Sequence, residues 1–293
     1  MDPVLGANGQ AIVATQQTNK MSTRSTRKKK TTMLSPKKFC DFILAKTASK
    51  SFEAGNAELY KELYLESPTY FHYFKSPKEK NFSENVWLYD ATRVIVPDVD
   101  YYHASWVDGL RPNQYVLAQA PRTAAAAKDF FKLLDHVKAE GLMIVEATDE
   151  FSTHITSKLE KGTGKKGCEK TCDDVMTAVI KTDRGTSVKC VKFMRSDAMN
   201  AQDLVDMLER ARKYIGCPTK RPLVICCRDG AGKSGLVAFA DTESDRLAKY
   251  GRVKHTDTIK QIRFMRCNTF DTFETYDLGI NTLIELCNRF KKK

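Results

Sequence analysis

The chain has 293 residues, 42% of them hydrophobic, and a formal net charge of +12, with nine scattered cysteines. This size suits one large domain or two small ones, and the apolar content is enough for a sizeable core. The sequence lacks an 18-residue apolar run and a secretory signal pattern, and an odd number of cysteines suits a reducing compartment better than a disulfide framework. We therefore expect a cytoplasmic protein without a membrane span.

The positive charge is concentrated near the N-terminus. Residues 1–40 carry eight basic side chains and one acid, a net charge of +7, which leaves +5 for the other 253 residues. Residues 1–34 are polar and lack apolar periodicity, so we expect a basic disordered tail there and a folded domain over 35–293. The tail segment RSTRKKK could direct the protein to the nucleus or simply be solvated, and specific nucleic-acid binding is not expected.

The first half of the folded part alternates between helical and extended patterns. Apolar residues three and four apart indicate helices, and β-branched and aromatic runs indicate short strands. Gly141 is expected to end the third of these helices. The expected helices are 36–48, 57–66 and 123–140, and the expected strands are 92–97, 100–109, 114–120 and 142–148.

The second half begins with a predicted hairpin and then returns to helices. VMTAVIKTD and SVKCVKFM alternate in polarity on either side of Arg184 and Gly185, which is typical of a hairpin. PLVICC reads as the central strand. Helices are expected over 201–216, 234–250, 255–266 and 272–290. The pattern predicts one α/β domain, a mixed twisted sheet with helices on both sides.

The segment RPLVICCRDGAGKSG, residues 221–235, is the most informative part of the chain. A buried strand leads through a glycine-rich loop into a helix, which gathers backbone N–H groups around an anion. Cys227 stands at the base of this loop, where a nucleophile would lie. The segment is therefore suited to bind a phosphate-like group.

Three interpretations of this segment remain open on the motif alone. A nucleotide-binding P-loop, G-x-x-x-x-G-K-[ST], matches Gly232, Lys233 and Ser234, but its first glycine falls on Cys227. A phosphatase loop, H-C-x-x-G-x-x-R-[ST]-G, matches Cys227, Gly230, Ser234 and Gly235. An ordinary glycine-rich turn between a strand and a helix is the third.

The chain resembles the Cys-dependent protein tyrosine phosphatases, non-receptor class, over roughly residues 40–290. The strings KNFSENVWLYDATRVIV, DYYHASWVDG, YVLAQAP and DFF follow the order and spacing of that family's motifs. In its divergent motifs and its basic tail, the chain most resembles the tyrosine phosphatase-like proteins of polydnaviruses (bracoviruses). The resemblance implies the phosphatase fold and a phosphotyrosine site.

The resemblance assigns roles to residues of the phosphate-binding loop. Cys227 holds the nucleophile position, preceded by Cys226 where the family has His. Lys233 replaces the Arg that forks around two phosphate oxygens, and Lys offers only a point charge. Asp229 adds a carboxylate that repels an incoming dianion. The expected phosphate-binding loop consists of Arg228, Asp229, Gly230, Ala231, Gly232 and Ser234.

Outside the loop, the remaining parts of the family's site are also altered. Asp197 is the best candidate for the general acid, without the usual Trp and Pro. Ser83 and Asn85 occupy the substrate-recognition positions, with Phe82 one place before the family's tyrosine. Asp271 replaces the Gln that positions the hydrolytic water.

These losses predict a catalytically impaired phosphatase-like protein, or pseudophosphatase, that acts by binding phosphotyrosine proteins or other signalling partners. If the viral placement holds, it would interfere with signalling and immunity in the host cytoplasm. The alternatives are a weak, atypical phosphatase that uses Cys227 and Lys233, and a nucleotide-binding P-loop protein. No metal or cofactor is expected.

Overall fold

The computed structural model describes most of the chain beyond residue 31. Residues 32–293 belong to one structural unit. The predicted tail up to residue 31 and the segment 194–198, which holds Asp197, lie outside the described residues. The described ranges are 32–48, 51–65, 73–74, 77–146, 175–193, 199–216 and 220–292.

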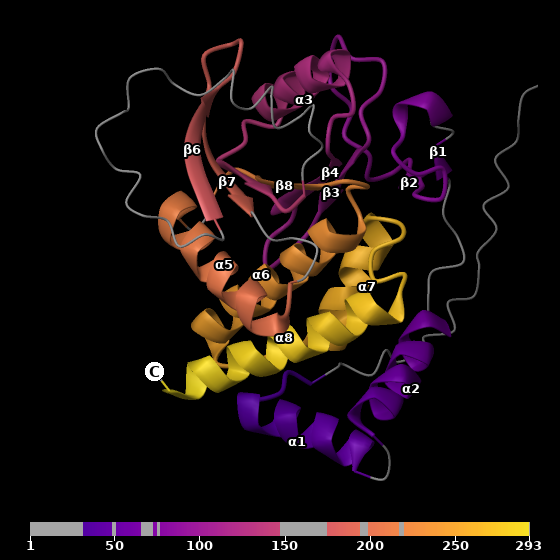
Figure 1. Cartoon of the computed structure of the whole chain (residues 1–293), viewed down its shortest axis with the longest axis vertical. Helices are drawn as coiled ribbons and strands as arrows, with labels where there is room; N and C mark the ends of the chain where they lie inside the picture. The colour runs from indigo at the N-terminus through magenta and orange to yellow at the C-terminus, as the bar shows by residue number, and fades with distance from the viewer. Residues whose placement is uncertain are drawn as a thin grey trace, which may run out of the picture. The chain divides into compact units, whose positions relative to one another are not determined.

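The described elements follow the predicted order closely (Figure 1). The α-helices are α1 (Pro36–Thr47), α2 (Phe52–Leu65), α3 (Ala124–His136), α5 (Ala201–Ile215), α6 (Gly232–Tyr250), α7 (His255–Met265) and α8 (Phe273–Lys292). The strands are β1 (Tyr73–Phe74), β2 (Leu88–Tyr89), β3 (Ala104–Val107), β4 (Tyr115–Gln119), β5 (Gly141–Ile144), β6 (Val175–Lys181), β7 (Ser187–Phe193) and β8 (Leu223–Cys227). A 3-10 turn spans Lys78–Lys80.

The main sheet is mixed, as predicted. Its order is β3-β4-β8-β5-β7-β6, and β1 pairs with β2 in a small separate sheet. The strands β4, β8, β5 and β7 run parallel, whereas β3 and β6 are antiparallel to their neighbours. The strand that leads into the glycine-rich loop therefore lies inside the sheet, with partners on both edges.

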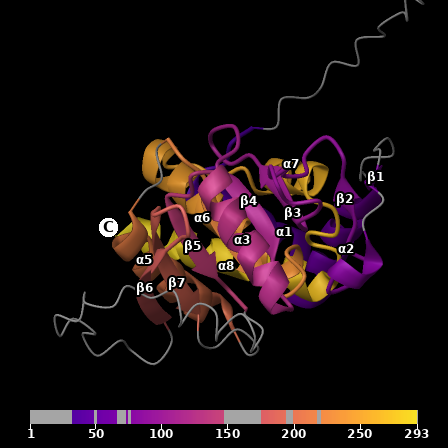
Figure 2. The same ribbon diagram turned by 90° about the horizontal axis from the view of Figure 1, so that it is seen from above.

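Helices cover both faces of this sheet (Figures 1 and 2). The helix α3 packs on one face, and α5, α6 and α8 pack on the other. Because side chains alternate along a strand, consecutive cysteines of β8 enter different cores. Cys226 contacts the α3 side and Cys227 the α6 side. Among the described residues, no helix is long and apolar enough to cross a membrane.

Two local predictions are wrong. Residues 92–97 form no named strand, and only Arg93 makes an isolated bridge, to Ser105 of β3. The helix α3 ends at His136, before Gly141, because Lys138 takes a left-handed conformation with φ 52°. The helical spacing of apolar residues continues past His136, so the sequence pattern predicts a longer helix than the structure has.

Buried charges join α5 to α6 behind the glycine-rich loop. The guanidinium of Arg212 on α5 binds the carboxylate of Asp241 on α6, which is 0% exposed. The hydroxyl of Tyr115 on β4 donates to the same carboxylate at 2.8 Å. Since a buried charge is costly without partners, this network fixes α6 against the sheet.

Gly230 lets the glycine-rich loop approach β4. Its φ is 68°, and a Cβ at this position would lie 2.4 Å from the Gln119 nitrogen. Backbone atoms cannot move aside as a flexible side chain can. The loop conformation therefore requires glycine here.

We predict that Gly230→Ala lowers the free energy of unfolding by roughly 2–4 kcal/mol, through left-handed strain plus a backbone clash. Gly185→Ala is the matched control, because its φ is 83° but nothing lies within 4 Å of the added Cβ. The control should lose only about 1–2 kcal/mol. Urea denaturation of both variants measures the difference, and equal losses would contradict the clash.

Candidate active site

The loop after β8 forms a cradle, defined here as residues 227–234. The backbone N–H of Ser234 donates to the Cys227 sulfur at 3.3 Å. The N–H groups of Ala231 and Gly232 turn inward in the same loop, where the first turn of α6 begins. Inward N–H groups and the positive end of a helix favour an anion at this place.

The anion in the cradle is the side chain of Asp229. Its Oδ1 accepts hydrogen bonds from the N–H groups of Ala231, at 2.8 Å, and Gly232, at 3.2 Å. The Cys227 thiol donates to the same oxygen at 3.1 Å. One carboxylate oxygen therefore occupies the position that the loop offers to an oxyanion.

This arrangement keeps Cys227 protonated. Burial, together with the charge of Asp229, raises the pKa of the Cys227 thiol to about 12, and hydrogen bonds from Ser234 oppose the rise only in part. A cysteine nucleophile needs its thiolate form, which reactive sites favour by lowering the pKa. The environment of Cys227 acts in the opposite direction.

Arg266 holds the cradle from beneath. It lies at the end of α7, is 0% exposed, and donates to the carbonyl oxygens of Gly230 at 2.8 Å and Asp229 at 3.2 Å. A third donation reaches the Ser105 hydroxyl at 3.3 Å. Because the Gly230 carbonyl faces Arg266, the Ala231 N–H of the same peptide unit faces the cradle, whereas the Gly230 N–H donates to the Cys227 carbonyl at 3.2 Å.

Lys233 forms an ion pair with Glu146 and not with Asp229. Its Nζ lies 3.5 Å from Oε1 of Glu146, just after β5, and Arg228 Nε lies 3.8 Å from the same oxygen. Glu146 thus attracts two cations of the loop. A single ammonium shared in this way cannot supply the two parallel hydrogen bonds of a guanidinium fork.

An aromatic ring lies beside the cradle despite its shifted position in the sequence. The Phe82 ring has the Arg228 guanidinium carbon 4.9 Å from its centroid and that of Arg122 at 5.5 Å. Phe82 is 37% exposed. Of the predicted recognition residues, Ser83 accepts a hydrogen bond from the Asn85 backbone at 3.2 Å, a local turn. Phe82 is therefore the recognition-loop side chain that the structure places against the cradle.

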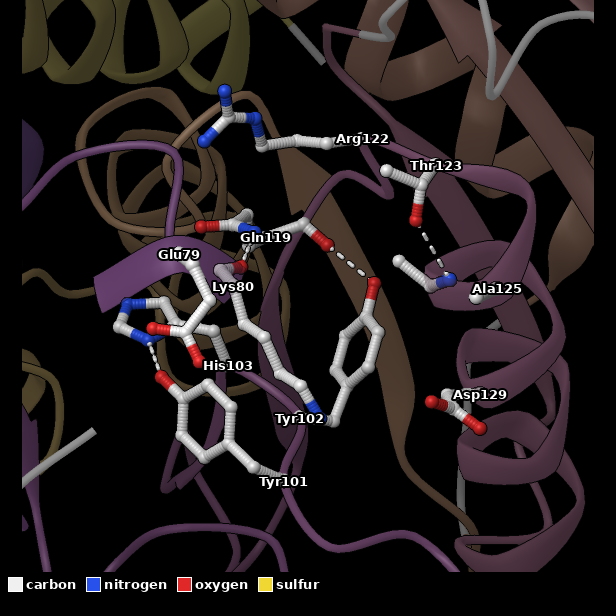
Figure 3. Close-up of a pocket in the computed structure, with 11 residues that line it drawn as sticks. Glu79, Lys80, Tyr101, Tyr102, His103, Gln119, Arg122, Thr123, Ala125 and Asp129 are labelled. Carbon is white, nitrogen blue, oxygen red and sulfur yellow. Dashed lines mark hydrogen bonds between the residues drawn. The ribbon is translucent and has the colours of Figure 1, made fainter. Parts of the chain in front are cut away.

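Gln119 anchors the segment that carries Phe82. Its side chain donates to the Lys80 carbonyl at 3.0 Å (Figure 3). It also accepts from the Phe82 N–H at 2.5 Å. A cavity of about 140 Å³ adjoins this anchor and shares no lining residue with the cradle. Its lining mixes acids, bases and two tyrosines, so its charge selects no particular ligand.

Of the last two predicted residues, the structure describes only Asp271. Asp271 accepts from the Asn268 side chain at 3.0 Å, on the loop between α7 and α8. The same loop packs closely on α6, since a Cβ on Gly235 would lie 2.7 Å from Thr269. Asp197 is outside the described residues, so its role as an acid stays a prediction.

The geometry agrees with the comparison to known proteins. The family model of the protein-tyrosine phosphatases matches residues 77–285. The chain belongs to the protein-tyrosine phosphatase family. Its relatives include receptor-type tyrosine-protein phosphatase alpha of Mus musculus, 21% identical over 243 residues, and receptor-type tyrosine-protein phosphatase C of Rattus norvegicus, 22% identical over 235 residues.

The similarity to these relatives is distant and partial. The alignments cover 72% of this chain and 28% of the alpha protein, and 71% of this chain and 18% of the C protein. The chain thus spans less than a third of their lengths. Family membership fixes the domain and its fold, whereas activity and partners remain proposals.

Three site residues were missed by sequence reasoning: Arg266, Glu146 and Gln119. Gln119 stood in a recognised motif but without a role. Arg266 follows an amphipathic helix, where an arginine normally suggests a solvated position, so its sequence position gives no sign of burial. Glu146 follows an apolar strand, and a carboxylate directly after a buried parallel strand is a usable signal for a site residue.

We predict that Cys227 reacts slowly with iodoacetamide and that the rate rises about tenfold per pH unit from pH 6 to 9, since only the thiolate reacts. Asp229→Ala should accelerate the reaction, because the variant loses a negative charge and an acceptor beside the sulfur. Mass spectrometry of the peptide that contains Cys227 measures the rate. A plateau that begins near pH 6 would show that the thiol has a low pKa.

Proposed function

We propose that this protein is a catalytically silent member of the phosphatase family that acts by binding. The observation that carries the proposal is the Asp229 carboxylate inside the cradle, hydrogen-bonded to a protonated Cys227. A phosphoryl group needs the same N–H groups and an ionised sulfur. Both requirements are unmet while Asp229 occupies the loop.

Electrostatics add to this obstacle. A phosphate dianion that enters the cradle meets the charge of Asp229, and Lys233 is shared with Glu146. Loss of a preorganised group that stabilises transition-state charge costs roughly 3–4 kcal/mol, about a hundred- to a thousandfold in rate. The missing fork alone therefore predicts a severe loss, before the absent water-positioning Gln is considered.

Side chains beside the cradle support a role in binding. Phe82, Arg228 and Arg122 form an aromatic and cationic rim beside the cradle, which suits a phosphotyrosine ring or an acidic segment of a signalling protein. A phosphotyrosine would displace Asp229 to enter. If the similarity to bracovirus proteins reflects origin, these partners belong to the signalling and immune pathways of a host cell, in its cytoplasm or nucleus.

We expect no hydrolysis of p-nitrophenyl phosphate above a Cys227→Ser control, because the unmodified chain lacks both thiolate and fork. A continuous absorbance assay from pH 5 to 8 measures this. Turnover that depends on Cys227 would replace the proposal with the weak phosphatase.

Asp229→Ala should open the cradle and raise its affinity for inorganic phosphate at least tenfold, since the N–H groups of Ala231 and Gly232 lose their internal acceptor. Isothermal titration calorimetry measures the affinity. Asp271→Ala removes an equal charge from a neighbouring loop and is the matched control. Equal gains in both variants would mean that net charge, and not occupancy of the cradle, limits binding.

A further inference from the structure

A second concave surface lies away from the cradle. The helices α2, α5 and α8 contribute to a groove of about 760 Å³, much larger than the cavity of about 140 Å³ beside Gln119. It shares no residue with the phosphate-binding loop. The groove combines apolar and acidic side chains, whereas the chain as a whole has a positive net charge.

The groove has an apolar floor. Met199, Phe273, Leu278 and Ile284 line it, and each is only partly buried while packing on the main core. One side of these side chains is therefore held by the core and the other is open to the groove. Apolar surface of this kind favours a partner that also presents apolar groups.

Carboxylates line the same groove. Glu53 and Glu274 are exposed and have no cation within 4 Å among the described residues. Asp277 accepts only from amides, the Asn56 Nδ2 at 2.8 Å and the Asn281 Nδ2 at 2.9 Å. These three acids thus lack a compensating positive charge in the part of the chain that the structure describes.

Beside Asp277, a buried acceptor is also unsatisfied. Asn56 is 0% exposed, and its Oδ1 has no hydrogen-bond donor among the described residues, although its amide nitrogen binds Asp277. Asn56 does not line the groove itself, so this side of the groove presents the negative charge of Asp277. Donors and cations are the complementary groups.

We propose that this groove docks a basic amphipathic segment of a partner protein, with Lys or Arg side chains opposite Glu53, Glu274 and Asp277 and apolar side chains on the floor. The groove is larger than a single bound cation needs, and a cation would not use its apolar floor. The negative charge disfavours nucleic acid, anionic lipid and acidic peptides.

The position of the acids along α8 suggests the shape of the occupant. Glu274, Asp277 and Asn281 are three and four residues apart, so they lie along one side of α8, and Leu278 lies beside them. A helix placed along this side would match them with cations at the same spacing. The docking mode is thus a helix in a groove.

The test uses the full chain and a fluorescent synthetic peptide of about 14 residues with Leu at helical a/d spacing and Lys elsewhere. We expect saturable binding by fluorescence anisotropy that weakens with salt. The double variant Glu53→Gln/Glu274→Gln should bind at least tenfold more weakly, and its exposed positions should leave folding intact. A peptide with Ser in place of Leu should also bind poorly.

Glu79→Gln/Glu140→Gln is the matched control, with the same change of charge outside the groove. Equal weakening in the control, or no saturable binding by the unaltered chain, would overturn the proposal. So would full binding of the Ser peptide, which would reduce the effect to bulk charge. Sedimentation of the chain without peptide tests a second copy as the occupant, and self-association that the groove variant abolishes would replace the partner with that copy.

Discussion

A loop of inward N–H groups must have an acceptor, and this constraint governs the centre of the molecule. Arg266 binds the carbonyls of residues 229 and 230 from beneath, and the Ala231 N–H that follows the second carbonyl is directed into the cradle. Unpaired buried N–H groups are costly, so the loop is stable only with an anion or water in place. This chain supplies the anion itself, through Asp229.

The surrounding elements fix the backbone of this loop, and they do so without the side chains that would act on a phosphate. The interior strand β8, the glycine at 230 and the buried contact between Arg212 and Asp241 place the start of α6 beneath the N–H groups. None of these contacts involves the side chain of Lys233 or Asp271. The fold can therefore keep the shape of a phosphate site while the groups that would act on phosphate are changed.

The sequence predicted the sheet, the hairpin and the cradle because each leaves a local pattern. Alternation marks β6 and β7, and glycines mark the loop. It did not predict that Asp229 turns into the cradle, because a side-chain rotamer leaves no periodicity and repulsion from a substrate was the more obvious effect. The end of α3 at His136 was missed for a similar reason, since Lys138 is an ordinary residue in an unusual conformation. Arg266 was missed because burial of an arginine depends on carbonyls brought from another part of the chain.

The protonated state of Cys227 also bears on oxidation. Peroxide attacks thiolates, and a sulfenic acid forms first on cysteines that are ionised and accessible. Cys227 is 1% exposed and bonded to a carboxylate, with its pKa raised to about 12. The same contact that withholds the sulfur from phosphorus would withhold it from oxidants, so Cys227 would resist conversion to a sulfenic acid when peroxide is present.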